Sequence, residues 1–157
     1  MPKIWLQPTP RYYAKMADAF LALVASSGDD GNAVCAPLTF DGANGVGAVK
    51  MAELAPSVAS VLQTTVVCDG TPPGVLNAEC GADFVKTTQG APVGLDVAPL
   101  AKHCSVDGDA DRLVYYYHDD GGVFHLIDGD KIAALFAVFV TEVGAGNFVV
   151  DYFDSWV

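Results

Sequence analysis

The sequence predicts an α/β domain with a mixed β-sheet and flanking helices. A strand, a glycine-rich turn and a helix follow one another near residue 40, which is the front half of a βαβ unit with parallel strands. Near residue 113, two strand-like runs flank the turn Asp119–Gly122, which predicts an antiparallel hairpin. A chain of 157 residues has the length of one domain and is long enough to bury its own core.

The first half of the chain alternates helical and extended patterns. Apolar residues from Tyr13 to Val24 recur at helical spacing before a polar run that contains two glycines. Three further segments complete this half: a strand over 38–41, a helix that carries the apolar residues of 49–54, and a β-branched run over 62–67 that suits a buried parallel strand. The glycines between the first strand and the second helix indicate a tight turn.

The second half contains a long connection, the hairpin and another long helix. Residues 69–99 are rich in proline and glycine, so we expect a connection with short helical pieces. The expected elements after it are a strand around 103–106, hairpin strands over 113–117 and 123–127, a helix over 131–143 capped by Asp128 or Asp130, and a final strand over 148–153.

The composition excludes several classes of partner. The 8 basic and 19 acidic residues give a net charge of −11, whereas a nucleic-acid partner requires clustered lysine and arginine. The first ten residues lack the apolar run of a signal peptide, and the longest apolar stretch, Ile132–Val140, is too short to span a membrane. Four cysteines without a CxxC pair are typical of buried thiols in a reducing compartment. We therefore expect a cytoplasmic protein with no nucleic-acid or membrane partner.

The most informative motif is Asp107-Gly-Asp-Ala-Asp-Arg112, directly after a predicted strand. Asp107, Asp109 and Asp111 alternate with small residues, which allows their carboxylates to converge on one side of the loop. Three oxygen ligands without histidine or thiolate suit Mg²⁺, Mn²⁺ or Ca²⁺ better than zinc. Arg112 beside such a cation is placed to contact phosphate. A solvated acidic turn is the alternative, and the position at a strand end favours the metal site.

Two other kinds of site have similar motifs. An EF-hand loop requires glycine at its sixth position and glutamate at its twelfth, where this chain has Arg112 and His118. A phosphatase of the haloacid-dehalogenase type uses the first aspartate of its motif as the nucleophile, which here would be Asp107. The phosphatase stays open as an alternative, although Asp111 and the lack of a second acidic motif disfavour it.

Four blocks of the sequence resemble one enzyme family. They are DGANGVGAVK (41–50), LNAECGADFVK (76–86), SVDGDADRLVYYYH (105–118) and FHLIDGDKIA (124–133). Their order and spacing, within residues 12–143, resemble the α-D-phosphohexomutase superfamily. The second and fourth blocks resemble its phosphoacetylglucosamine mutase branch.

The resemblance implies a fold and a role for each motif residue. The fold would be the three-layer, mixed-sheet second domain of such a mutase. Residues 1–143 would form this metal-binding domain, and residues 144–157 would form the truncated start of the next domain or a divergent tail. The family interconverts N-acetylglucosamine 6-phosphate and N-acetylglucosamine 1-phosphate through a phosphoserine, a step toward UDP-N-acetylglucosamine. Asp107, Asp109 and Asp111 match its Mg²⁺ ligands, and Arg112 matches an arginine to which we assign phosphate contact in catalysis.

The chain also departs from the family pattern. Family members are several times longer, and the motifs for their phosphoserine, sugar-reading loop and phosphate-binding loop do not occur in these 157 residues. We therefore expect a fragment that binds Mg²⁺ but is inactive alone, and that meets its sugar phosphate only together with the missing domains. A stand-alone, non-catalytic Mg²⁺-binding module is the alternative hypothesis, followed by the Asp107 phosphatase.

Other conspicuous residues have structural interpretations. Asn44 and the glycines around it resemble an anion-binding turn, but tight-turn geometry explains them, and we favour that interpretation. Tyr115–Tyr117 alternate faces on a strand, which favours packing over a stacking platform. Cys80 and Asp83 lie within the second family block, and we expect both to be packing residues.

Overall fold

The computed structural model describes residues 10–26, 37–71 and 73–144 of the chain. Its elements are α1 (Pro10–Ser26), β1 (Leu38–Asp41), α2 (Val46–Val58), β2 (Thr64–Val67), α3 (Ala82–Thr88), β3 (Lys102–Val106), β4 (Leu113–His118), β5 (Phe124–Ile127) and α4 (Gly129–Gly144). The chain divides into two compact units, Met1–Leu126 and Ile127–Val157. The first unit holds the sheet with α1, α2 and α3, and α4 belongs to the second. The predicted domain boundary after residue 143 stays a prediction.

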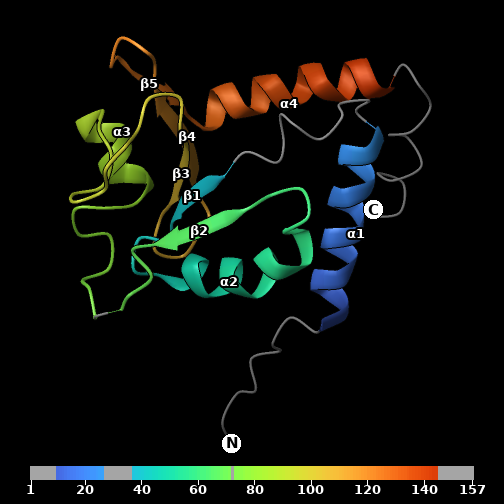
Figure 1. Cartoon of the computed structure of the whole chain (residues 1–157), viewed down its shortest axis with the longest axis horizontal. Coiled ribbons are helices and arrows are strands. Elements are labelled where there is room, and N and C mark those ends of the chain that lie inside the picture. Colours follow the sequence, from blue (N-terminus) through green and yellow to red (C-terminus); the bar gives the residue numbers. More distant parts are fainter. Residues whose placement is uncertain (1–9, 27–36, 72, 145–157) are drawn as a thin grey trace, which may run out of the picture. The chain divides into compact units, whose positions relative to one another are not determined.

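The sheet is mixed, as the sequence predicted. Its strand order is β2-β1-β3-β4-β5, and Figure 1 shows the strands beside α2 and α3. β1 runs parallel to both β2 and β3, whereas β3 and β4 are antiparallel. Because parallel strands end at the same edge, the turn after β1 and the loop after β3 start side by side.

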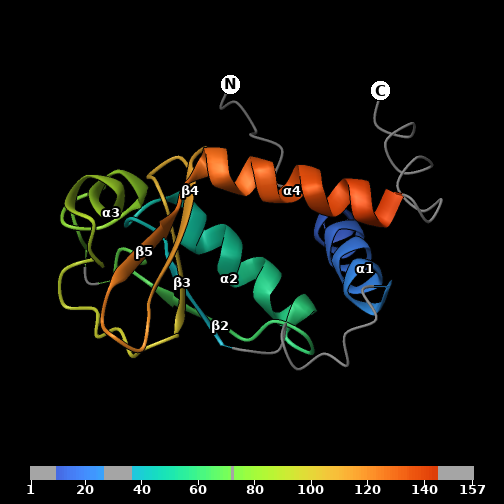
Figure 2. The same ribbon diagram turned by 90° about the horizontal axis from the view of Figure 1, so that it is seen from above.

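Two apolar clusters cover opposite faces of the sheet. On one face Phe40 and Val106 pack with Met51 of α2. On the other face Tyr116 of β4 packs with Val85 of α3, and both are fully buried. Burying a side chain of this kind stabilises a fold by roughly 1.5–3 kcal/mol. The predicted three-layer arrangement is therefore confirmed, with α2 and α3 on opposite sides of the sheet (Figure 2).

Most predicted elements have the expected type, but most of them have ends that differ from the predicted ones by one to three residues. α2 continues to Val58, with Pro56 inside its last turns. The backbone N–H of Leu62 donates to the carbonyl oxygen of Val58 at 2.8 Å, so this turn delays the start of β2 to Thr64. The predicted strand over 148–153 lies outside the described residues. None of the described helices has the length and apolar character needed to cross a lipid bilayer.

Candidate metal centre

The aspartate loop, residues 107–112, follows the carboxyl end of β3. A hydrogen bond of 3.0 Å from the backbone N–H of Ala110 to the carbonyl oxygen of Asp107 closes the loop. One carboxylate oxygen from each of Asp107, Asp109 and Asp111 lies within 4.8 Å of the other two. The structure therefore brings together the three side chains that the sequence predicts as metal ligands.

The donor set of this cluster fits a hard divalent cation. Asp107 is 2% exposed, whereas Asp109 and Asp111 are open to solvent. All three donors are carboxylate oxygens, with no histidine or thiol among them. Mg²⁺ prefers such ligands and keeps part of its water shell, which the two exposed side chains allow. The role of the three residues as metal ligands stays a prediction.

The turn after β1 supports the aspartate loop by very close backbone packing. The N–H of Val46 donates to the carbonyl oxygen of Gly108 at 3.1 Å. A Cβ atom on Gly45 would lie 2.2 Å from that same oxygen, which is far inside a van der Waals contact. Glycine at position 45 is therefore required for the contact between the two loops, and this explains one glycine of the predicted tight turn.

Asn44 has a structural role in the same turn. Its side-chain oxygen accepts a hydrogen bond from the N–H of Gly70 at 3.1 Å, and its amide nitrogen donates to the carbonyl oxygen of Val75 at 3.1 Å. The amide group thus ties the segment after β2 to the turn. These contacts support the tight-turn interpretation over an anion-binding one.

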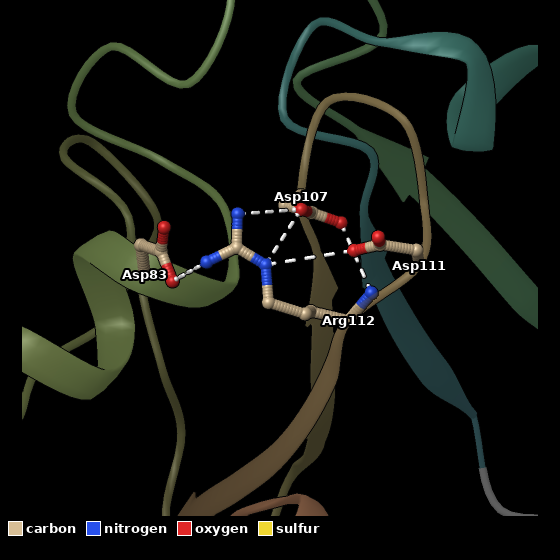
Figure 3. Close-up of polar contacts among 4 residues, drawn as sticks. All are labelled: Asp83, Asp107, Asp111 and Arg112. Carbon is tan, nitrogen blue, oxygen red and sulfur yellow. Dashed lines mark hydrogen bonds and ion pairs between the residues drawn. The ribbon is translucent and has the colours of Figure 1, made fainter.

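Arg112 closes the cluster on one side (Figure 3). Its Nε and Nη2 atoms lie 2.8 and 2.7 Å from Oδ2 of Asp107, and its backbone N–H donates to Oδ1 at 3.1 Å. Nε also lies 3.6 Å from a carboxylate oxygen of Asp111. The structure therefore places the predicted phosphate-binding arginine directly against the aspartates.

Charge and burial shift the pKa of the Asp107 carboxyl group in opposite directions. Burial raises the pKa of its carboxyl group, but the hydrogen bonds and positive charge of Arg112 outweigh this effect and hold the pKa below its ordinary value. Hydrogen bonds to Asp83 and then to Asp107 raise the pKa of the Arg112 guanidinium. Both groups are thus ionised near neutral pH, which suits Asp107 to a metal ion and Arg112 to an anion.

Asp83 is a site residue that the sequence analysis missed. We expected it to pack, but its side chain is 63% exposed and forms an ion pair with Nη1 of Arg112 (Figure 3). The two residues are 29 positions apart, and Asp83 lies in the first turn of α3. The family block that contains Asp83 marked the region, but no local pattern links positions 83 and 112.

Asp41 connects the elements that carry the site. It is fully buried, and its Oδ2 accepts hydrogen bonds of 2.7 Å from both the N–H of Gly81 and the hydroxyl of Ser105. Its Oδ1 accepts a bond of 2.9 Å from the N–H of Ala43. Asp41 thereby fixes the start of α3 against the ends of β1 and β3.

Three of the four cysteines lie in the described part of the chain, and all three are free thiols. Cys80 and Cys104 are buried, whereas Cys68 is half-buried. Cys68 and Cys80 lie near Asp41, and burial, followed by the charge of Asp41, raises the pKa of Cys68 to about 12. Thiols whose pKa is raised in this way are unreactive, so this group fits a structural role. Cys35 lies outside the described residues.

Comparisons with known proteins identify one family. A family model described as phosphoacetylglucosamine mutase AMG1, domain II, matches residues 7–114. The phosphoacetylglucosamine mutase of Homo sapiens is 46% identical over 132 residues, which cover 84% of this chain and 24% of that protein. The Saccharomyces cerevisiae enzyme is 42% identical over 136 residues, with coverage of 83% and 24%. This chain thus spans about a quarter of the length of the curated relatives it matches.

Solved structures give the same result. The Aspergillus fumigatus N-acetylphosphoglucosamine mutase in complex with GlcNAc-6P and magnesium superposes with a TM-score of 0.72 at 41% identity, and covers 85% of this chain and 26% of that one. A substrate complex of N-acetylglucosamine-phosphate mutase, a member of the α-D-phosphohexomutase superfamily, superposes with a TM-score of 0.77 at 38% identity, with coverage of 85% and 25%. The chain therefore belongs to the phosphoacetylglucosamine mutase family.

Proposed function

We propose that this chain is the Mg²⁺-binding domain of a phosphoacetylglucosamine mutase, which interconverts N-acetylglucosamine 6-phosphate and N-acetylglucosamine 1-phosphate. The observation that carries the proposal is the convergence of Asp107, Asp109 and Asp111 in a chain of this family. The Aspergillus fumigatus relative was solved with GlcNAc-6P and magnesium, which supports the choice of both ligands.

Each residue of the aspartate loop has a distinct task in this proposal. Asp107, Asp109 and Asp111 hold the cation, and Mg²⁺ bound there offsets negative charge on a transferring phosphoryl group. Arg112 offers a planar set of N–H donors that suits two phosphate oxygens at once. The side chain of Asp107 is buried and its oxygens accept hydrogen bonds from Arg112, so it is poorly placed to attack phosphorus as a phosphatase nucleophile.

The rest of the reaction requires groups beyond these 157 residues. The family transfers phosphate through a serine, and no serine of this chain has the family's Ser-His-Asn-Pro-like context. We therefore propose that the chain alone is inactive as a mutase, and that the sugar phosphate binds when the other domains are present. We also place the protein in the cytoplasm, which the free thiols of Cys68, Cys80 and Cys104 support.

A metal titration of the purified chain tests the proposal. Mn²⁺ replaces Mg²⁺ as a paramagnetic probe, and electron paramagnetic resonance measures the free ion. We expect one site, with binding weakened at least about tenfold by Asp107→Asn or Asp109→Asn, because each change removes an ionised ligand. Asp120→Asn is the matched control, since it removes the same charge from an exposed position in the hairpin turn. Equal binding by all four proteins would refute the metal site.

The phosphatase alternative is tested in the same preparation. Our proposal predicts that the chain with Mg²⁺ releases no phosphate from an aryl phosphate above the rate of buffer alone. Release that Asp107→Asn abolishes would instead identify Asp107 as a nucleophile.

A further inference from the structure

The guanidinium of Arg112 contacts two kinds of carboxylate. Asp107 and Asp111 belong to the candidate metal cluster, whereas Asp83 lies on α3 outside it. The contacts also use different nitrogens, because Asp83 pairs with Nη1 while Asp107 receives Nε and Nη2. Among the described residues, Asp83 is the one partner of this guanidinium that a metal ion in the cluster would leave unoccupied.

A bound cation would compete with Arg112 for Asp107. Oδ2 of Asp107 accepts both guanidinium contacts, at 2.8 and 2.7 Å. A cation that ligates the same carboxylate withdraws its electron density and repels the nearby positive charge. The contacts from Arg112 to the cluster therefore weaken when metal binds, and the contact to Asp83 does not depend on the cluster.

Asp83 stands on a firmly held part of α3. The N–H of Gly81 donates to the buried carboxylate of Asp41 at 2.7 Å, directly before the helix begins. Ala82 and Val85 are buried against β4. A Cβ atom on Gly81 would lie 3.2 Å from the carbonyl oxygen of Val106, so the helix start lies close beside the residue that precedes Asp107. The backbone of Asp83 is thus fixed relative to the aspartate loop.

We propose that Asp83 is a positioning residue, which keeps Arg112 beside the cluster when a cation is bound and so holds its remaining N–H donors ready for phosphate. The inference rests on the proposed function, because it requires both a cation in the cluster and a phosphate next to it. A guanidinium has five N–H donors, and the pair with Asp83 leaves enough of them for a bidentate phosphate contact.

If Asp83 and Arg112 formed only a surface ion pair, loss of the Asp83 charge would have the opposite effect on anion binding. The side chains of Arg112 and Asp83 are 55% and 63% exposed, so their pairing contributes little to folding. If Asp83 were only a charge near the site, its neutralisation would remove a repulsion and strengthen the binding of phosphate. If Asp83 positions Arg112, the same change weakens the binding of phosphate.

The test compares three variants of the chain loaded with Mn²⁺. Electron paramagnetic resonance gives the affinity for Mn²⁺, and phosphorus-31 relaxation then follows the titration of inorganic phosphate. For Asp83→Asn we expect a Kd for Mn²⁺ within about twofold of the wild type and a Kd for phosphate raised about tenfold. Asp83→Glu retains the carboxylate and should recover most of the phosphate affinity. Asp120→Asn removes the same charge elsewhere and should leave phosphate binding unchanged.

The possible results distinguish a positioning role of Asp83 from a structural role and from failure of the metal site. Unchanged or tighter phosphate binding by Asp83→Asn, with normal Mn²⁺ binding by the wild type, would overturn the positioning role and leave the metal site intact. Equal losses in Asp83→Asn and Asp83→Glu, together with a lower Tm, would assign Asp83 a merely structural role. If the wild-type chain bound no Mn²⁺, the proposed function would fail and this inference with it.

Discussion

Asp41 is a buried carboxylate whose charge is balanced by hydrogen-bond donors. Two backbone N–H groups and the hydroxyl of Ser105 surround it, at 2.7–2.9 Å. A buried charge is tolerated only when such donors replace the water it has lost. The donors come from the turn after β1, the start of α3 and β3, so this one residue joins the elements that carry the aspartate loop and Asp83.

We predict that Asp41→Asn lowers the free energy of unfolding by about 2–3 kcal/mol, because one amide N–H₂ must then face a hydrogen-bond donor. Ser105→Ala removes a single donor and should cost about 1 kcal/mol. Urea denaturation measures both, with Asp120→Asn as the control for the lost charge. A variant Asp41→Asn as stable as that control would contradict the account of this network.

Because His103 is buried, we predict that the protein loses stability in mild acid. Its ring is 2% exposed, is stacked on Tyr116, and has no hydrogen-bond partner for either nitrogen among the described residues. Burial, and then the charge of His118, holds the pKa of His103 below its ordinary 6.5. The unfolded chain therefore takes up a proton first as the pH falls, so the contribution of His103 to stability is full above pH 6.5 and is lost below it.

The variant His103→Phe tests this pH dependence, because it keeps a flat ring against Tyr116 but has no titrating group. In the wild type we expect up to about 1.4 kcal/mol of stability to be lost per pH unit below 6.5 through this residue. The variant should show a shallower loss between pH 6.5 and pH 5 in urea denaturation. Identical slopes for the two proteins would exclude His103 as the cause.

At the scale of elements, local patterns predicted most of the fold. β1 was predicted with its observed ends, and the hairpin was predicted from its turn, where Oδ1 of Asp119 accepts hydrogen bonds from Gly121 and Val123. These features depend on neighbouring residues, so a sequence pattern carries them. β2 starts later than predicted because the chain after α2 forms a turn that is hydrogen-bonded to the carbonyl oxygen of Val58. Apolar periodicity does not predict such a turn.

The hairpin turn provides a local test at this scale. Gly122 has a φ of 79°, and no heavy atom lies within 4 Å of a Cβ added there. Gly122→Ala should therefore lower the free energy of unfolding by about 1–2 kcal/mol through backbone conformation alone. Gly90→Ala is the matched control, because its added Cβ meets only ordinary contacts and its φ is not positive. Equal stability of the two variants would contradict a left-handed turn.

In the whole molecule, one part of the site could be predicted from the sequence, and another part depends on the tertiary structure. Asp107 to Arg112 are consecutive, so one loop suffices to bring them together, and the motif predicted them. Asp83 meets Arg112 across 29 positions, and Asp41 meets Ser105 across 64. Those contacts follow from the strand order and from the face that α3 covers, which local patterns do not specify. Asp83 was missed for this reason.

We propose that the aspartate loop serves a mutase, whose reaction requires the other three-quarters of such an enzyme. The most direct measurement replaces the matching segment of the human relative with this chain and assays the conversion of N-acetylglucosamine 6-phosphate to the 1-phosphate with Mg²⁺. We predict a folded and active chimera, and a loss of activity of at least about a hundredfold on Asp107→Asn, since phosphoryl charge then lacks its main counter-charge. A folded chimera that is inactive, or one whose activity survives Asp107→Asn, would contradict the claim.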